Sequence, residues 1–379
     1  MKHNTTAGLL ALAAFVLAVP AAAQGTISNL GFGYPSGQLS TRSLGAGGAL
    51  GEIDPLSATN PAVLSYFGGS VLYFQAEPEY RTLHIAGATE KSSVARYPLI
   101  VAAFPVATNL MLGLSVSNLL ERSFETSSRG NAQVGDSLLA TTNRFKSDGA
   151  VGDLRIALSW NVYNWLKLGA SAHAIAGDNR VSNIQSFDDS TRFARLLDTA
   201  TVGYTGNAYS AGFELIGGDQ VSFAGSYRRG GHLSLKRGDT TLSNAHVPDR
   251  LALSVAYLGI KGTTLAVRTA KDTWSRMALL GSNNVHITDS WDTSIGADVL
   301  GPRLGSNPVQ LRAGLRSRTL PFGLAAQSVS EKSYSFGAGT LLSRGRAALD
   351  IAGIHASRSA GSTLSESAWT LSVGVTVRP

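Results

Sequence analysis

The chain of 379 residues contains no cysteine, so no disulfide bond stabilises its fold and no lipid can be attached to a cysteine after export. Charged residues are also scarce, at 15% of the sequence. Beyond residue 23, no apolar run is long enough for a helix to span a bilayer. These absences exclude a disulfide-stapled secreted domain, a lipoprotein and a bundle of membrane helices.

The first residues have the layout of a secretory signal peptide. Lys2 and His3 precede an apolar run over 7–19, and three alanines follow at 21–23. We therefore predict a signal peptide over 1–23 that is cleaved after Ala23. The net charge is +7, or +6 once Lys2 is removed with the signal peptide, and an exported basic chain has an anionic lipid surface, rather than nucleic acid, as its expected counterpart.

Glycine is abundant, at 42 residues, and the mean hydropathy is slightly positive, at +0.07. Moderate hydrophobicity without spanning helices is typical of an exported chain that forms a transmembrane β-barrel, because the polar face of each strand dilutes the apolar one.

Apolar and polar residues alternate along many segments, as β-strands with two different faces require. At the end of the chain Leu371, Val373 and Val375 fall on one face, while Ser372 and Thr376 fall on the other. Fourteen such segments are found, near 69–80, 95–105, 109–124, 149–161, 165–178, 203–216, 219–236, 249–258, 262–275, 289–300, 308–319, 332–342, 346–358 and 367–378.

The connections between these segments are alternately short and long. Short ones include 162–164 and 217–218, and long ones include 125–148 and 179–202. Short periplasmic turns and long outer loops are typical of an outer-membrane barrel, whereas a soluble β-sandwich has no reason to sort its loops in this way. The predicted fold is therefore an all-β, transmembrane, antiparallel up-and-down barrel of about 14 strands over 67–379.

Charged and polar residues lie on the face of these strands that we predict to line the lumen, since a cation facing lipid is costly. The predicted lumen-facing polar residues are Asp153, Arg155, Lys167, His173, Asp298, Arg312, Arg316 and Asp350.

The stretch 43–64 lacks this alternation. Its glycines allow close approach to another surface, and its prolines restrict any helix to a short one. Asp54 and Asn60 are predicted N-caps before Pro55 and Pro61. Apolar side chains favour a small helical hatch over 24–66 inside the lumen, and a flexible linker is the alternative. The predicted hatch and gating residues are Gly45, Gly47, Gly48, Asp54, Asn60, Pro61 and Ala62.

The residues from Leu44 to Ala49, together with Asp54 and Asn60-Pro61-Ala62, resemble the N-terminal hatch of FadL-type transporters of long-chain fatty acids, a superfamily shared with the type IX secretion barrels. Segments near 311–315 and 335–339 are similar to the same families, whereas 120–210 matches little. The resemblance implies a 14-stranded barrel, closed by a hatch, that passes hydrophobic compounds. The chain ends in Val377-Arg378-Pro379 rather than in an aromatic residue, which departs from many outer-membrane barrels.

The predicted barrel and hatch are compatible with two functions. The first is passive uptake of hydrophobic small molecules, such as long-chain fatty acids, across a bacterial outer membrane; the alternative is a secretion-like barrel that binds or shuttles a protein client. The expected partners are membrane lipids, lipopolysaccharide, a hydrophobic ligand and the barrel-assembly machinery. Arginines of the predicted outer loops either contact lipid phosphates or are simply solvated.

An enzyme is not predicted, and no cofactor is expected. Ser171 and His173 share a face near Asp153, but residues two apart on a strand lie about 7 Å from each other, so the sequence favours polar lumen lining over a catalytic triad. The histidines show no metal-ligand spacing.

Overall fold

The computed structural model describes residues 27, 30, 32–85, 88–134, 136–189, 191–218, 220–280, 285–305, 307–324, 327–361 and 364–379. The predicted signal peptide and the first residues of the predicted hatch lie outside the described residues. Among the described residues, no helix has the length and apolar character needed to cross a membrane.

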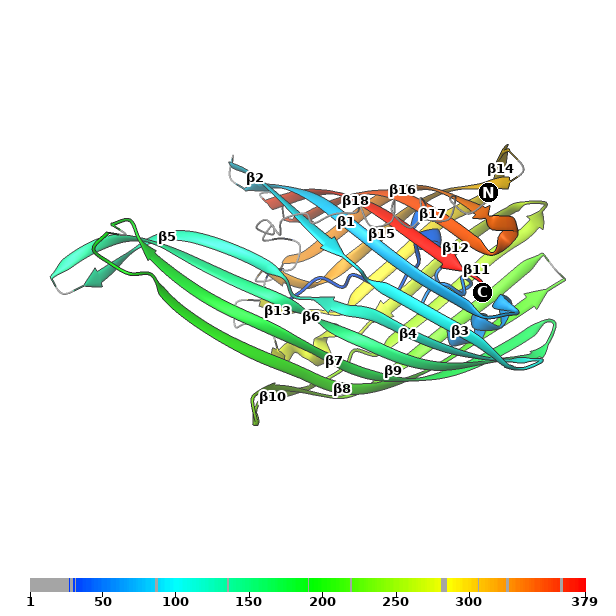
Figure 1. Ribbon diagram of the computed structural model, residues 1–379, viewed down its shortest axis with the longest axis horizontal. Coiled ribbons are helices and arrows are strands. Elements are labelled where there is room, and N and C mark those ends of the chain that lie inside the picture. The colour runs from blue at the N-terminus through cyan, green and yellow to red at the C-terminus, as the bar shows by residue number, and fades with distance from the viewer. Residues whose placement is uncertain are drawn as a thin grey trace, which may run out of the picture.

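The chain forms a closed antiparallel β-barrel of 14 strands, as predicted (Figure 1). Strand β1 pairs with β18, so the first and last strands complete the wall. The ten uninterrupted strands are β1 (Val71–Ile85), β6 (Ser137–Tyr163), β7 (Leu166–Phe187), β8 (Leu196–Gly217), β9 (Val221–Arg237), β12 (Thr263–Asp272), β15 (Asn307–Leu324), β16 (Gln327–Leu342), β17 (Ala347–Ala360) and β18 (Leu364–Val377).

Each of the other four strands is made of two segments, because the two segments pair with the same neighbour on either side of a short break. These pairs are β2 (Ala88–Arg96) with β3 (Leu99–Ala107), β4 (Leu110–Glu121) with β5 (Phe124–Val134), β10 (Thr240–His246) with β11 (Arg250–Ile260), and β13 (Val285–Ile287) with β14 (Ser290–Leu304). Proline causes two of the breaks, since Pro98 and Pro248 cannot donate a ladder hydrogen bond.

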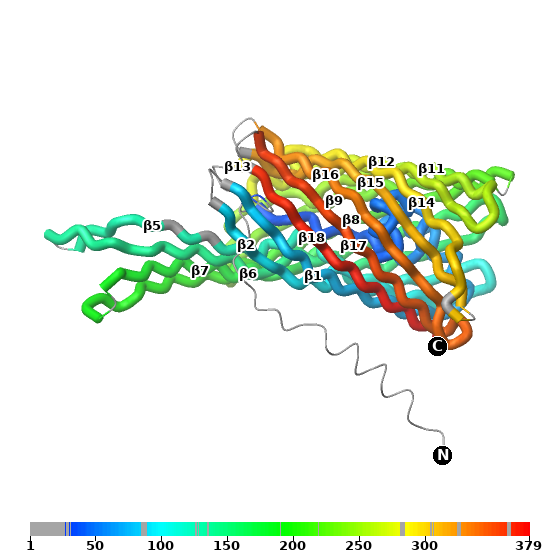
Figure 2. The backbone as a smooth tube through the Cα atoms, turned by 90° about the horizontal axis from the view of Figure 1, so that it is seen from above, coloured from blue at the N-terminus to red at the C-terminus, as the bar shows by residue number. Residues whose placement is uncertain are grey.

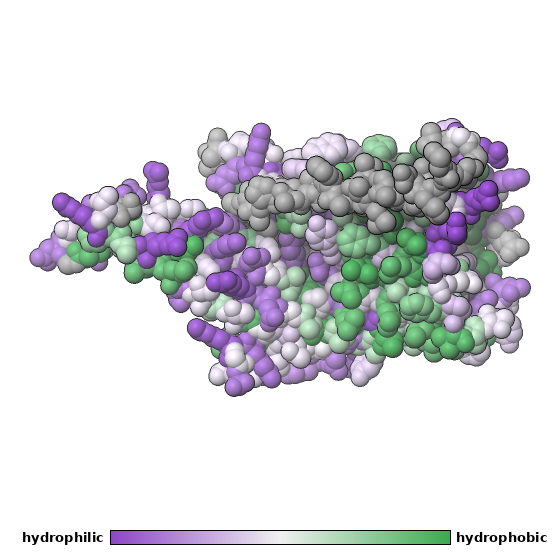
Figure 3. Space-filling view, viewed as in Figure 1, coloured by the Kyte–Doolittle hydropathy of each residue, from purple (hydrophilic) through white to green (hydrophobic). Residues whose placement is uncertain are grey.

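Two of the predicted long loops are wrong. Residues of 125–148 and 179–202 continue β5, β6, β7 and β8 into a sheet that projects beyond the barrel (Figure 1). The alternation is lost there because both faces of the projecting sheet lie outside the barrel wall, so neither face needs to be apolar. Figure 3 shows this sheet as largely hydrophilic, in contrast with the apolar barrel surface.

Apolar side chains of the barrel point outward. On β6, Leu154, Ile156 and Leu158 are exposed, while Asp153 and Arg155 between them are buried in the lumen. The hydrophobic band over the barrel in Figure 3 is made of such residues. An outward apolar surface around a charged interior is the arrangement that a transmembrane barrel needs.

The N-terminal segment lies inside the barrel, where Figure 2 shows it in blue. It contains the helix α2 (Thr41–Gly45), a series of turns, and the 3₁₀ helix η1 (Pro61–Phe67). Two more short 3₁₀ helices, η2 (Trp274–Leu280) and η3 (Ser343–Gly345), lie at opposite ends of the barrel wall. We call residues 32–67 the hatch.

The exposure of apolar residues on the outer face of the barrel can be tested by mutation. Leu315 is 60% exposed on the apolar surface. We expect Leu315→Arg to destabilise the inserted barrel by about 2–4 kcal/mol, because a cation then faces lipid at mid-bilayer. Leu315→Ala is the control. Heat-dependent gel mobility of refolded protein measures the folded fraction, and equal folding of both variants would place this face outside the membrane.

Candidate functional site

The first contact between hatch and wall is a backbone contact at glycine. Ala46 and Gly47 lie directly against Gly296 on β14 and Gly314 on β15, and a Cβ added at Gly314 would lie 2.2 Å from the carbonyl carbon of Ala46. At Gly47 the φ angle is +68°, a conformation that favours glycine. Ser335 on β16 secures the same turn, because it accepts a hydrogen bond from the Gly47 amide at 2.9 Å and donates one to the Gly45 carbonyl at 3.1 Å.

The second contact holds the end of the hatch. Asn60 is the N-cap of η1, as predicted, and its Oδ1 accepts a hydrogen bond from the Ala62 amide at 3.0 Å. Its Nδ2 donates to the carbonyls of Glu52, at 2.9 Å, and Phe213 on β8, at 3.1 Å. Gly212 leaves room for this side chain, since a Cβ there would lie 2.0 Å from the Asn60 Oδ1. Asn60 therefore joins the hatch to itself and to the wall.

Asp54 does not begin a helix. Its carboxylate does accept a hydrogen bond from the Leu56 amide at 3.4 Å, and it also accepts hydrogen bonds from the hydroxyls of Ser40 and Ser57. Arg42 lies 3.9 Å from Asp54 and 3.1 Å from Asp298 on the wall. Asp54 thus caps a turn rather than the predicted helix, and it belongs to a network that includes the lumen carboxylate of Asp298.

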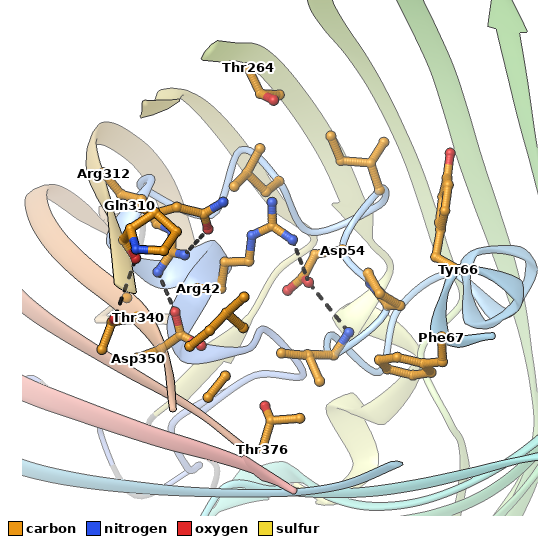
Figure 4. Close-up of a pocket in the computed structure, with 18 of the residues that line it drawn as sticks. Arg42, Asp54, Tyr66, Phe67, Thr264, Gln310, Arg312, Thr340, Asp350 and Thr376 are labelled. Atoms are coloured by element: carbon orange, nitrogen blue, oxygen red, sulfur yellow. Dashed lines mark hydrogen bonds and ion pairs between the residues drawn. The ribbon is translucent and has the colours of Figure 1, made fainter. Parts of the chain in front are cut away.

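These two hatch residues line a cavity of about 500 Å³ at the short-turn end of the barrel. In Figure 4 Arg42, Arg312 and Asp350 lie on one side of it, Tyr66 and Phe67 lie on the other, and Asp54 lies between the two groups. Leu50, Ile53 and Leu56 of the hatch add apolar surface. The cavity is therefore both charged and apolar.

At the opposite end of the lumen, apolar side chains pack together. We call this group the apolar lumen cluster; its members include Phe32 of the hatch and Leu83, Leu120, Trp274, Phe322 and Val329 of the wall and its loops. Phe32 meets Trp274 edge to face, with ring centroids 6.2 Å apart. The hatch thus lies between an apolar cluster and a cavity.

A ring of charges surrounds Tyr34 of the hatch. The guanidinium groups of Arg96, Arg318 and Arg358 lie 4.7–4.9 Å from the centre of its ring, and Glu331 accepts a hydrogen bond from its hydroxyl at 3.0 Å. Burial raises the pKa of the Tyr34 hydroxyl, against the opposing effect of the arginines, so the phenol remains protonated.

A buried charge of the hatch also needs a wall partner. Glu52 is fully buried, and its carboxylate lies 3.3 Å from Nε of Arg268 on β12, which is buried as well. Ser226 on β9 donates a second hydrogen bond to Glu52 at 2.7 Å. Glu52 and Tyr34 were missed from the sequence, because the hatch has no periodicity. Arg268 could have been found from its alternation with Val267 and Thr269.

The structure places the predicted polar wall residues inside the barrel, in separate groups. Arg312 joins Asp298 and Asp350, at 3.1 and 2.5 Å, and Arg316 pairs with Asp292 at 2.7 Å. Lys167 lies 3.4 Å from Glu214. Asp153, Arg155 and His173 form another group that touches the hatch, because Gln38 donates to Asp153 at 2.7 Å and Arg155 donates to the Thr59 carbonyl at 3.4 Å.

The spacing of Ser171 and His173 along their strand predicts that they are too far apart for a direct hydrogen bond, and this prediction is wrong. Their Oγ and Nε2 atoms lie 3.2 Å apart, because the imidazole leans along the strand toward the serine. In the described part of the chain, no cluster of histidine, aspartate and glutamate is arranged to hold a metal ion.

No protein family and no curated protein matches the sequence. Solved structures do match the fold. A FadL homologue from Pseudomonas aeruginosa has a TM-score of 0.64 at 12% identity, with 91% of this chain and 99% of that chain covered. The Pseudomonas putida toluene transporter TodX gives 0.57 at 15% identity over 92% and 99%, and the Ralstonia pickettii toluene transporter TbuX gives 0.54 at 13% over 91% and 99%.

The glycine contact predicts that a side chain at Gly314 displaces the hatch. The chain lacks cysteine, so a single Ala58→Cys substitution reports on exposure of the buried hatch. We expect Gly314→Val to raise the rate of maleimide labelling about tenfold, because a clash of about 1.4 kcal/mol suffices for that shift. Gly353→Ala is the control, since nothing lies within 4 Å of a Cβ there. Equal labelling in both variants would contradict a close contact at Gly314.

Proposed function

We propose that the protein is an outer-membrane channel for passive uptake of hydrophobic small molecules, with the hatch as its gate. The observation that carries this proposal is the position of residues 32–67 between the apolar lumen cluster and the 500 Å³ cavity. A hydrophobic compound gains free energy on reaching the cluster, at roughly 25 cal/mol for each Å² of apolar surface buried. It can continue to the cavity only if the hatch moves.

The fold similarity supports the same class of cargo. The matched structures include two that are described as toluene transporters and one described as a FadL homologue. Long-chain fatty acids are one class of ligand that fits the proposal, and small aromatic hydrocarbons are another. The aromatic side chains of Phe32, Trp274 and Phe322 in the cluster favour a ligand with a flat or flexible apolar body.

Gating requires that the ligand binds unequally to the two positions of the hatch. The proposed gating residues, Gly45, Gly47, Gly48, Asp54, Asn60, Pro61 and Ala62, lie at the two wall contacts and at the internal network of the hatch. Several hatch–wall contacts are hydrogen bonds and ion pairs. Polar groups in a lumen can exchange such partners for water, so these contacts can open at moderate cost.

The location follows from the apolar exterior. We propose export through the signal peptide at 1–23, insertion by the barrel-assembly machinery, and a surround of phospholipid and lipopolysaccharide. The short turns then face the periplasm and the projecting sheet faces outward. Arg144 of that sheet is exposed and paired with Glu125, so at least this arginine already has a partner other than lipid phosphate.

A protein client is the second candidate function, and the projecting sheet favours it. Among the described residues β5 pairs with β6 alone, so its other edge offers backbone groups that an extended segment of another chain could meet. This role and uptake of small molecules use different parts of the barrel.

A disulfide that reversibly holds the hatch against the wall tests whether the hatch gates uptake. The side-chain oxygens of Thr41 on the hatch and Ser372 on β18 lie 2.8 Å apart. We expect the double variant Thr41→Cys, Ser372→Cys to form a disulfide when oxidised and to lower uptake of labelled oleate or toluene into liposomes to the level without protein. Reduction should restore uptake, and each single variant is a control. Equal uptake by the oxidised and reduced forms would show that the hatch does not gate.

A further inference from the structure

Three side chains on adjacent strands form a chain of hydrogen bonds inside the lumen. Oγ of Ser210 on β8 lies 3.0 Å from Nε2 of His173 on β7, and Nδ1 of His173 lies 2.8 Å from Oδ1 of Asp153 on β6. The register brings them together, because Ser210 pairs with Ser171, two residues before His173. Nucleophile, base and orienting acid are all within hydrogen-bond reach.

The chemistry of the three side chains decides which atom donates and which accepts in each of these hydrogen bonds. Asp153 can only accept, so the His173 Nδ1 carries the proton that it donates to the carboxylate. Nε2 is then the acceptor for a serine hydroxyl, which is the state that a general base needs. Gln38 of the hatch donates to the other oxygen of Asp153, at 2.7 Å, and holds the carboxylate in place.

A buried cation lies beside the serine. Arg228 on β9 is the cross-strand neighbour of Ser210. Its side chain is 5% exposed, and among the described residues its Nε has no hydrogen-bond partner. Its terminal nitrogens are 3.9 Å from Asp153 and 3.7 Å from Asp272. A donor without a partner next to a nucleophile can stabilise an oxyanion.

We propose that the lumen contains a serine esterase site in which Ser210 is the nucleophile, His173 the general base and Asp153 the group that orients it. Its substrates are carboxylic esters with an apolar acyl group that enter the barrel. This activity is additional to the proposed uptake and does not depend on it.

Each step of the reaction is balanced. The Ser210 Oγ forms a bond to the acyl carbon as its proton passes to the His173 Nε2, and Arg228 stabilises the oxyanion. The C–O bond of the ester then breaks, and the alcohol leaves with the proton from His173. Water attacks the acyl-enzyme, gives its proton to His173, and the carboxylic acid leaves as that proton returns to Ser210.

Ser171 is the competing nucleophile, since its Oγ lies 3.2 Å from the same His173 nitrogen. Ser210 is preferred because it is the serine that neighbours Arg228. Ser171 and Ser210 are each 8% exposed, so burial does not distinguish between the two serines.

The test uses the purified full chain in detergent, with diisopropyl fluorophosphate as the probe and p-nitrophenyl butyrate as the substrate. We expect a phosphorylated Ser210, identified by peptide mass spectrometry, and ester hydrolysis that falls about 100-fold or more in both Ser210→Ala and His173→Gln. His173→Gln should also lose the adduct, although its serine is intact, which a merely structural role for His173 does not predict. Heat-dependent gel mobility confirms that each variant is folded.

Ser294→Ala is the matched control, because Ser294 is another buried serine of the barrel wall and lies outside this site. It should retain both the adduct and the hydrolysis. Absence of an adduct on the folded native chain would overturn the proposal, and so would an adduct that persists in His173→Gln. An adduct on Ser171 alone would overturn the assignment of Ser210.

Discussion

The structure depends on direct backbone contact between the hatch and the barrel wall. Glycine occupies the wall positions that face the turn at Ala46 and Gly47, and glycine again faces Asn60 at the other end. A side chain at Gly314 would overlap the hatch backbone, and one at Gly212 would overlap the Asn60 side chain. These two contacts bring the hatch backbone and the Asn60 side chain directly against the wall, where the polar contacts between hatch and wall also form.

The second constraint is that charges in a closed lumen must be neutralised. Isolated ions away from water cost several kcal/mol, so each needs a partner. Glu52 of the hatch meets Arg268 of the wall, and Arg42 of the hatch meets Asp298. The hatch is therefore part of the electrostatic balance of the barrel. Removal of the hatch would leave wall charges such as Arg268 and Asp298 without these partners, so water would have to solvate them.

Much of the fold could be predicted from the sequence, because lipid and lumen impose opposite demands on successive residues. All 14 strands were found in this way, and Leu371 and Val375 are exposed while Ser372 and Thr376, predicted on the other face, are buried. The projecting sheet was missed, since residues 125–148 and 179–202 carry no such contrast. The N-cap at Asn60 followed from local chemistry, which requires only the next two residues.

The arrangement of the site could be predicted much less well. Alternation placed Asp153 and His173 on the lumen side of their strands, but it does not give the register between strands that brings Ser210 to His173. Glu52 and Tyr34 have partners far away in the sequence, on strands whose neighbours are known only once the barrel closes. The contacts between the hatch and the barrel wall depend on how the two fit together in three dimensions. The hatch sequence has no periodic pattern from which those contacts could be predicted.

The central claim is that the hatch is the barrier in the lumen and the site of ligand control. Deletion of residues 43–58 tests it most directly, in liposomes that report both swelling in small sugars and uptake of a labelled fatty acid. We expect the truncated protein to form a folded barrel that leaks the sugars and takes up the fatty acid without saturation. If the truncated and intact proteins show the same swelling and the same saturable uptake, the hatch is neither barrier nor gate.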